Sequence, residues 1–330
     1  MSFSLITGVD IGHYSIKAVV LKPVKGTLTL SGYRELVIEE SIFSDNHLLS
    51  YQEIVNKLKE LRKGLPFFSH KVALSLPDNS VISKVLHVEK GLTPQERDYA
   101  IIEAFSHQSP FDLDELCLDY CDLSNEAGSS QGVQVYATKK EVVENRMSVC
   151  RKAGFRPVLF DVHAHSLVRL WQAVSQKQSR SNWLLLDVGH HHSSMVMDFA
   201  NKAPFAKDLP IGISSMLASS EEPSALHHDV THQFIQSLVE RIQRHLHLIE
   251  SMDSSKLEGI WLTGGGANTP ALADELAQRL NLKCELLDPL SLFENKNSRK
   301  KASHACGYSF SSSVGLALLG QDWMGRRHAS

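Results

Sequence analysis

The sequence predicts an α/β protein whose two lobes are copies of one another, with an additional αβ subdomain inserted into the first lobe. The first observation is a repeated motif: DIGH at residues 10–13 returns as DVGH at residues 187–190. The second is that each copy stands at a turn between two apolar, strand-like runs and is followed by further strand and helix patterns. The third is a change of texture over residues 81–157, which interrupts the first copy.

Composition limits the classes of protein to which the chain can belong. It has 330 residues, of which 42% are hydrophobic and 22% charged, and its formal net charge is −3. These values are ordinary for a globular protein, and the charge gives no general attraction to nucleic acid. We find no apolar run of the roughly 18 residues that a membrane span needs, and no signal-peptide pattern at the start. Five scattered cysteines favour reduced thiols in a cytosolic protein.

The first lobe begins with strands at residues 3–11, 16–22 and 27–38 around two turns. Residues 51–64 place apolar side chains at helical spacing and end in a glycine, which predicts an amphipathic helix. Residues 71–77 are a further strand. We therefore expect a hairpin sheet with a helix packed on it.

The inserted segment, residues 81–157, contains the patterns of a compact αβ module. Its first strand is followed by a helix at residues 92–108, where Thr93 and Glu96 form a capping-box pattern. A hairpin with a polar loop comes next, and a second helix at residues 139–155 closes the module. A strand and helix then resume the pattern of the first lobe.

The second lobe repeats the design of the first. Residues 183–211 contain three short strands, and residues 232–250 form an amphipathic helix. Residues 259–282 are a strand, a glycine loop and a helix whose first position we assign to Pro270. Residues 305–320 form a helix rich in small side chains.

These patterns divide the chain into five parts. Residues 1–80 are the first lobe with the first hairpin tip, residues 81–157 are the inserted subdomain, and residues 158–181 return to the first lobe. Residues 182–310 are the second lobe with the second tip and the glycine loop, and residues 311–330 are a C-terminal helix and tail that return to the first lobe.

The repeated tips have the chemistry of a phosphate and metal site. A tight turn of small residues exposes several backbone N–H groups, which suit an anion, and Ser15 adds a hydroxyl donor. Gly12 lets the backbone approach the ligand closely. A carboxylate beside a phosphate would repel it unless a cation lay between them, so Asp10 indicates Mg²⁺ held through water. Lys17 either pairs with phosphate or is an outward-facing strand residue.

The second tip offers Asp187, Gly189 and the hydroxyls of Ser193 and Ser194. Two such tips facing one another would clamp a triphosphate and its metal. The loop at residues 264–266 can accommodate a nucleoside lying flat on the backbone. Taken alone, either tip motif is typical of an ordinary turn, and the argument depends on their order and spacing. The candidate nucleotide-binding residues are Asp10, Gly12, His13, Tyr14, Ser15, Lys17, Asp187, Gly189, His190, His191, Ser193, Gly212, Gly264, Gly265, Gly266 and Asn268, with Asp10 and Asp187 as the candidate Mg²⁺ residues.

This arrangement resembles the actin-like fold of actin, Hsp70 and sugar kinases, which has two phosphate loops, an adenosine loop and a small-residue C-terminal helix. Nearly the whole chain is also similar to the PilM family of type IV pilus assembly proteins. The motifs that carry this resemblance are GVDIGHYSIKAV, SLPDNSVISKV, SPFDLDEL, YATKKEVVENRM, DLPIG, LTGGGANTPALADEL and ACGYSFSSSVGLAL. The chain departs from the family pattern at His190–His192, where small residues and Thr are usual, and at Ile213–Ser215.

The resemblance implies a cytoplasmic, ATP-binding adaptor at the inner face of the bacterial inner membrane. Such a protein docks on the cytoplasmic N-terminal peptide of the inner-membrane protein PilN, and its membrane association is peripheral, through that partner. The insertion corresponds to the extra subdomain shared with FtsA, and self-association is a further possibility. A groove for the peptide is expected around Val81, Ile82, Val85 and Val88.

Two other functions remain open at this point. One is an actin-like small-molecule kinase, although we find no convincing signature for an acceptor pocket in the first lobe. The other is a filament-forming ATPase like FtsA, whose amphipathic C-terminal anchor is not matched by the short polar end DWMGRRHAS. No residue stands out as a base that would activate water, so we expect ATP hydrolysis to be slow or absent.

Overall fold

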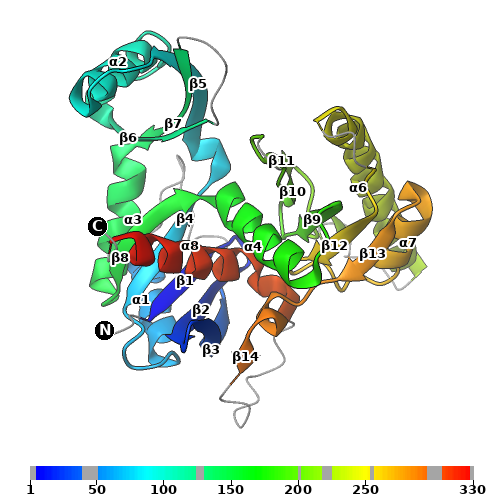
Figure 1. The fold of residues 1–330 in the computed structure, drawn as a ribbon. Helices are drawn as coiled ribbons and strands as arrows, with labels where there is room; N and C mark the ends of the chain where they lie inside the picture. Colours follow the sequence, from blue (N-terminus) through cyan, green and yellow to red (C-terminus); the bar gives the residue numbers. More distant parts are fainter. Residues whose placement is uncertain are drawn as a thin grey trace.

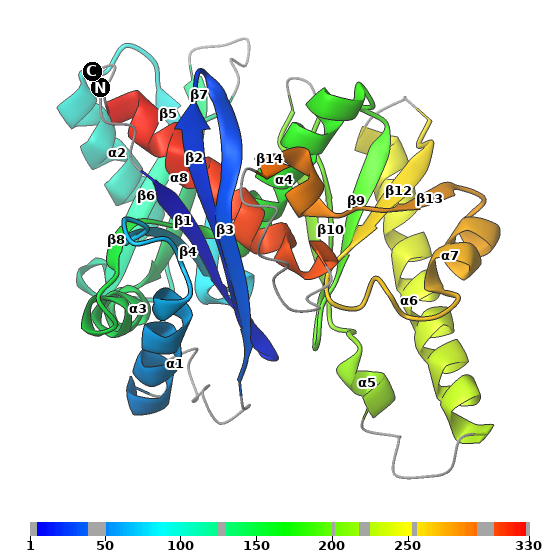
Figure 2. The same cartoon turned by 90° about the horizontal axis from the view of Figure 1, so that it is seen from below.

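The computed structural model describes residues 5–38, 51–123, 130–199, 202–217, 225–252, 256–295 and 307–327. Two lobes lie side by side, and the inserted subdomain projects from the first of them (Figure 1). Two long helices, α4 (His163–Gln178) and α8 (Ser311–Arg327), lie between the lobes, and α8 crosses the molecule diagonally when it is seen from below (Figure 2). Within the described residues, no helix combines the length and the apolar character that crossing a bilayer would require.

The first lobe is built on a six-stranded sheet. Its strands, in spatial order, are β14 (Glu294–Asn295), β3 (Thr27–Val37), β2 (Ser15–Val24), β1 (Ile6–Ile11), β4 (Lys71–Leu76) and β8 (Arg156–Val162). The strands β1, β2 and β3 are antiparallel, whereas β4 and β8 continue the sheet parallel to β1.

The second lobe repeats this order. Its sheet runs β11 (Phe205–Leu209), β10 (Ser193–Met197), β9 (Trp183–Val188), β12 (Gly259–Thr263) and β13 (Lys283–Leu286). Here too an antiparallel meander of three strands is extended by two parallel strands. The duplication expected from the repeated motif is therefore confirmed at the level of topology.

Helices cover both faces of the first sheet. Side chains alternate along β2, so Ala18 and Val20 face α1 (Tyr51–Lys63) and α3 (Lys140–Lys152), while Val19 and Leu21 belong to the core shared with α4 and α8. In the second lobe, α6 (Ala225–Met252) and α7 (Leu272–Leu280) supply much of the core. A one-turn helix, α5 (Ser214–Leu217), lies between β11 and α6 in the sequence.

The small residues at the start of α8 allow close packing at the junction of the lobes. A Cβ on Gly315 would lie 1.8 Å from the backbone oxygen of Ser166 in α4, and one on Gly8 would lie 2.0 Å from the backbone oxygen of Ser313. Larger residues would therefore push α8 away from β1 and α4. These close contacts hold the first turn of α8 against β1 and α4, where the two lobes meet.

The inserted subdomain is a three-stranded sheet, ordered β5 (Val81–Glu89), β7 (Ser130–Lys139) and β6 (Leu116–Asp122), with α2 (Pro94–Ser106) on one face. The expected capping box is present, because the Thr93 hydroxyl accepts a hydrogen bond from the backbone N–H of Glu96, and the Glu96 carboxylate accepts one from the backbone N–H of Thr93. The core of this subdomain is separate from those of the lobes.

The helix α3 connects the insertion to the first lobe. Its C-terminal half, together with the residues that follow it, packs under α1: Val149, Cys150, Ala153 and Phe155 all belong to the first-lobe core. The range 81–157 assigned to the insertion from sequence therefore contains side chains on which the first lobe depends.

Three helix boundaries differ from those expected from sequence. The helix α6 begins at Ala225 rather than at residue 232. The helix α7 begins at Leu272 and not at Pro270, because Ala271 adopts the left-handed conformation with φ of 63° and interrupts the turn. The helix α8 continues past residue 320 to Arg327, and Asp322 in this added part forms an ion pair with Arg169 of α4 at 2.6 Å.

Candidate functional site

The turns that carry the repeated motif have the same backbone geometry in both lobes. At the first tip, the N–H of Gly12 donates to the carbonyl of Ser15 at 3.1 Å, and at the second the N–H of Gly189 donates to the carbonyl of His192 at 3.0 Å. Each turn therefore closes across three residues directly after the strand that carries the aspartate. Both tips line one pocket of about 500 Å³.

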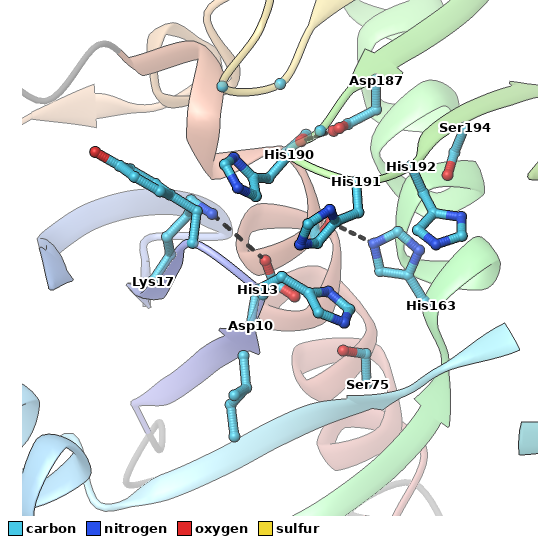
Figure 3. A pocket seen from close by; sticks show the side chains of 18 of the residues that line it. Asp10, His13, Lys17, Ser75, His163, Asp187, His190, His191, His192 and Ser194 are labelled. Atoms are coloured by element: carbon cyan, nitrogen blue, oxygen red, sulfur yellow. Dashed lines mark hydrogen bonds and ion pairs between the residues drawn. The ribbon is translucent and has the colours of Figure 1, made fainter. Parts of the chain in front are cut away.

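Aromatic rings connect the two tips across this pocket. Tyr14 of the first tip stacks on His190 of the second, with ring centroids 5.2 Å apart and planes at 28°. His13 meets His191 edge-on at 5.0 Å. Figure 3 shows His190 and His191 between Asp10 and Asp187, which come from opposite lobes. Burial and the three neighbouring histidines of the second tip lower the pKa of His13.

The histidines of the second tip are held by polar neighbours. His191 Nδ1 lies 2.9 Å from the Ser214 hydroxyl, and His192 Nδ1 lies 2.9 Å from a carboxylate oxygen of Asp208. Among the residues that the structure describes, no three metal-ligating side chains come together as a metal site. The three histidines of the run line the pocket.

Two carboxylates face the pocket from the ends of equivalent strands. Lys17 pairs with Asp10 across the first hairpin, with Nζ 3.9 Å from Oδ2. Asp187 accepts a hydrogen bond from the Ser311 hydroxyl at the start of α8. Burial raises the pKa of Asp187, and Ser311 and His163 oppose this rise only in part. Lys17 pairs with Asp10 and also lines the cavity. These two contacts support the interpretation of Lys17 as a pocket residue and not as an outward-facing strand residue.

These two carboxylates fit a hydrated Mg²⁺ ion. Both are hard oxygen donors, and a Cβ on Gly12 would lie 3.9 Å from Asp10 Oδ2, in the space that the glycine leaves free. A cage made wholly of protein ligands is not formed among the described residues. An ion between Asp10 and Asp187 would thus keep several waters and take the remainder of its ligands from phosphate.

The cleft also contains a chain of polar contacts centred on His163, the first residue of α4. Its Nδ1 lies 3.6 Å from Asp78, two residues after the end of β4, and its Nε2 lies 2.8 Å from the Ser312 hydroxyl in α8. Asp78 in turn accepts a hydrogen bond from the backbone N–H of Ala164 at 2.9 Å. Burial alone would lower the pKa of His163, but the carboxylate of Asp78, with Asp10 and Asp187 farther away, raises it to about 9. His163 is therefore a cation at neutral pH.

The glycine loop borders the pocket from the second lobe. The N–H of Gly264 donates to the carbonyl of Tyr308, and the N–H of Gly266 donates to that of Val188, so both ends of the loop are fixed. A Cβ on Gly264 or Gly266 would collide with residue 188, whereas a Cβ on Gly265 meets nothing within 4 Å. Gly265 is thus the point where the backbone lies open to the cavity.

The structure brings most of the expected nucleotide-binding residues to this one pocket. The lining includes Asp10, Gly12, His13, Tyr14, Ser15, Lys17, Asp187, Gly189, His190, His191, Gly264 and Gly265. It does not include Ser193, Gly212, Gly266 or Asn268. The Ser193 hydroxyl donates to the carbonyl of Ile211 instead, and Ser194 lines the pocket in its place. The hydroxyl of Ser15 donates to Glu35 at 2.6 Å and is already engaged.

Gly212 has a packing role. A Cβ there would lie 2.2 Å from the carbonyl oxygen of His190, so the glycine allows the histidine turn to lie against the start of α5. Sequence analysis also missed several lining residues, which come from distant elements: Glu35, Ser75, Asp78, Arg146, His163, Asp208, Ser309, Ser311 and Ser312. Of these, only the serines at the start of α8 belong to a pattern that the sequence shows, in the segment expected to be a helix rich in small side chains.

The four expected groove residues are divided by the structure. Ile82, Leu86 and Val88 face α2 and form part of the core of the insertion, with Val88 only 5% exposed. Val85 points to the opposite face and is 49% exposed, and Val81 shares that face because side chains alternate along β5. This outer face is bounded by Tyr136, whose hydroxyl lies 3.2 Å from His165 Nε2 in α4.

The ion pair of His163 and Asp78 predicts a pH dependence of stability. A histidine whose pKa is raised from about 6.5 to about 9 on folding stabilises the protein fully below pH 6.5 and loses this effect as the pH passes 9. We expect the free energy of unfolding to fall over that window by on the order of 2 kcal/mol, after allowance for partial exposure. Urea unfolding at several pH values measures it.

The variant His163→Gln should lose most of this pH-dependent decrease in stability. His247→Gln serves as the matched control, since His247 is a histidine on α6 whose side chain is 88% exposed. Equal slopes for wild type and His163→Gln between pH 6.5 and 9 would contradict the assignment.

Comparison with known proteins agrees with this architecture. The model of the type IV pilus assembly protein PilM family matches residues 8–216 and 214–321. Among solved structures, a PilM–PilN type IV pilus biogenesis complex superposes with a TM-score of 0.78 at 20% identity, covering 96% of this chain and 98% of that chain. The ethanolamine utilization protein EutJ from Carboxydothermus hydrogenoformans gives a TM-score of 0.53 at 12% identity, with 96% and 90% covered.

The expected two-lobed, actin-like fold is therefore confirmed. The family match spans both hairpin tips, the insertion, the glycine loop and most of α8. The chain belongs to the PilM family of type IV pilus assembly proteins.

Proposed function

We propose that this protein is a nucleotide-dependent adaptor of type IV pilus assembly. It binds ATP with Mg²⁺ between its lobes, and it docks on the cytoplasmic N-terminal peptide of a PilN-type protein at the inner face of the inner membrane. The observation that supports nucleotide binding best is the pair of equivalent turns, each following an aspartate, that line one pocket with Gly265 open beside them. The partner is inferred from the family and from the complex to which this chain is similar.

The charges of the pocket suit a triphosphate with its metal. Lys17, His163 and Arg146 supply positive charge, and Arg146 is buried enough that its pKa falls to about 10, which still leaves it charged at neutral pH. Asp10 and Asp187 would repel phosphate directly, and Mg²⁺ between them and the phosphates removes that repulsion. Metal and nucleotide should therefore bind together.

Slow or absent hydrolysis remains part of the proposal. A water-activating base must be able to accept a proton at neutral pH. Of the pocket histidines, the ring of His13 packs edge-on against His191, and His163 is already protonated under those conditions. It suits binding of negative charge better than removal of a proton from water.

Docking of the peptide is assigned to the outer face of the insertion. The strand β5 lies at the edge of its sheet, and a peptide in extended conformation can use the backbone of such an edge for hydrogen bonds. Val81 and Val85 supply apolar contact on the same face. The contact between Tyr136 and His165 joins this face to α4, whose first residue lines the nucleotide pocket. This connection gives the nucleotide a physical route by which it can influence the docking face.

A neutral variant of Asp10 tests the metal-linked part of the proposal. Asp10→Asn keeps the shape of the side chain and removes its charge, so the affinity for ATP with Mg²⁺ should fall by about tenfold or more. Affinity for ATP in the presence of a chelator should be unchanged or higher, because Lys17 is released from its pairing with Asp10. Isothermal titration calorimetry measures both.

Asp274→Asn, at an exposed position in the first turn of α7, is the control and should behave as wild type. Equal affinity of Asp10→Asn and wild type for ATP with Mg²⁺ would remove Asp10 from the metal site. Absence of heat from ATP with Mg²⁺ in folded wild-type protein would contradict nucleotide binding itself.

A further inference from the structure

A pair of exposed phenylalanines stands on a fixed turn of the first lobe. The turn Pro66-Phe67-Phe68-Ser69 joins α1 to β4, and it is closed by a hydrogen bond from the N–H of Ser69 to the carbonyl of Pro66 at 3.0 Å. Phe67 is 89% exposed and Phe68 is 68% exposed, with ring centroids 5.1 Å apart.

The residues on both sides of this turn are anchored. Leu65 is buried in the first-lobe core, and Ser69 is 2% exposed, with its carbonyl accepting a hydrogen bond from the Thr7 hydroxyl. The two rings are therefore presented to solvent by a rigid support. Large apolar side chains held out in this way are typical of a contact surface.

Positive charge surrounds the two rings. Arg62 and Lys63 precede the turn, and Lys71 follows it. The neighbouring strand β8 begins at Arg156, which is paired in register with Lys71. The end of α3 lies beside the end of α1, because Arg62 donates to the carbonyl of Ala153, and it adds Arg151 and Lys152.

Neither chain segment that forms this surface contains an acidic residue. Residues 61–72 and 151–160 have only basic, polar and apolar side chains, although the whole chain has a net charge of −3. The carboxylates that flank the two segments are both engaged, since Glu60 pairs with Arg34 at 3.6 Å and Asp161 lies 2.7 Å from His165 Nδ1. The local positive charge is thus a property of this surface and not of the protein in general.

We propose that this surface binds directly to the anionic surface of a phospholipid bilayer. Phe67 and Phe68 enter the interfacial region, where aromatic rings are favoured, and the surrounding Arg and Lys side chains contact lipid phosphates. A bilayer is favoured over a protein partner because the two rings protrude from a convex turn with cations around them, an arrangement that suits a flat, deformable, negatively charged surface. This contact goes beyond the proposed function, since it requires no partner protein.

The position of the surface leaves the other sites accessible. The turn precedes the first residue of β4, whereas Ser75 and Asp78, at the other end of that strand, line the pocket. The helix α3 separates the surface from the insertion by 13 residues, or about 20 Å. Figure 1 shows α1, α3 and β8 on the side of the first lobe that faces away from the second lobe. A protein lying on a bilayer through this side would keep its cleft open to ATP.

Flotation of the full-length protein with lipid vesicles tests the proposal. We expect wild type to float with vesicles of phosphatidylethanolamine and phosphatidylglycerol, and to float poorly with phosphatidylcholine vesicles or at high salt. The double variant Phe67→Ser/Phe68→Ser should bind anionic vesicles about tenfold or more weakly. Each neutralised basic residue, as in Lys63→Ser or Lys152→Ser, should weaken binding about fivefold.

Tyr99 provides the matched control, because it is an aromatic side chain that is 75% exposed on α2 of the insertion. Tyr99→Ser should bind vesicles as wild type does. In a second measurement, Phe67→Trp fluorescence should be quenched by lipids with brominated acyl chains, and that of Tyr99→Trp should not, each relative to the wild-type tryptophan signal.

Two results would overturn the proposal. One is wild-type protein that does not float with anionic vesicles at low salt, or a double variant that floats equally well. The other is a change in the sedimentation of lipid-free protein when both phenylalanines are replaced. That result would show that the surface is a contact between two copies of the chain.

Discussion

Substitution of Gly265 by valine is expected to abolish measurable ATP binding while the protein stays folded. The backbone of Gly265 faces the pocket, and an added Cβ has no atom within 4 Å, so the valine side chain projects into the space proposed for the nucleoside. We expect affinity for ATP with Mg²⁺ to fall by about a hundredfold or more, because the ligand and the side chain cannot occupy the same volume. Calorimetry measures the affinity.

The neighbouring glycines show why this position is suited to the test. Gly264 has a φ of +92°, and a Cβ there would lie 2.4 Å from the carbonyl oxygen of Val188, so a substitution at Gly264 would damage the loop itself. Gly265→Ala is the graded control and should weaken binding less than valine does. Thermal unfolding of Gly265→Val close to that of wild type would show that the fold is intact. Wild-type affinity in Gly265→Val would place the nucleoside elsewhere.

Substitution of Val85 by aspartate is expected to abolish binding of the N-terminal peptide of a PilN-type protein. Val85 is half exposed on the outer face of β5, where a charge would remain solvated in the free protein but would be buried without a partner beneath an apolar peptide. We expect the dissociation constant to rise by about a hundredfold. Val37→Asp is the matched control, since Val37 is a strand valine that is 55% exposed in the first lobe.

The rate at which Cys121 is alkylated tests the position of the bound peptide independently of the Val85→Asp variant. Cys121 is exposed in β6 and lies in register with Gln134 of β7, which is itself in register with Val85 of β5, so both side chains belong to the same face. A bound peptide should slow alkylation of Cys121 and leave the rate at Cys284, in the second lobe, unchanged. Unchanged alkylation of Cys121 in the complex would remove this face from the docking site.

These point variants are preferred to removal of the insertion. A deletion of residues 81–157, the range that sequence suggests, would also take Val149, Cys150, Ala153 and Phe155 out of the first-lobe core. Loss of several buried side chains costs several kcal/mol, so such a protein would be unfolded or severely destabilised. Failure of the deleted protein to bind would then say nothing about docking.

Sequence predicted the parts of the fold and site that depend on local patterns. The two hairpin tips, the glycine loop and the capping box of α2 each have a signal within a few adjacent residues, and the structure contains all of them. The duplication was visible because the pattern Asp-x-Gly-His stands at the end of a strand in both halves. The resemblance to the family rested on motifs of the same local kind.

The parts that sequence missed are created by tertiary contacts. Asp78, His163 and Ser312 come from a strand end, a helix start and another helix, and no spacing rule connects them. The sequence offers the hydroxyls of both Ser193 and Ser194 at the second tip, and only the pairing of β9 with β10 shows that Ser194 is the one in register with Asp187. Gly212 is among the nucleotide-binding residues predicted from sequence, but the group that approaches it in the structure is the carbonyl of His190.

The central claim is that this chain connects nucleotide binding to a membrane-anchored partner. Calorimetric titration of the full-length protein, loaded with ATP and Mg²⁺, with a synthetic N-terminal peptide of a PilN-type protein tests it most directly. We predict saturable binding at one peptide per chain, lost in Val85→Asp and retained in Val37→Asp. An absence of binding to folded wild-type protein, or equal binding by Val85→Asp, would contradict the account.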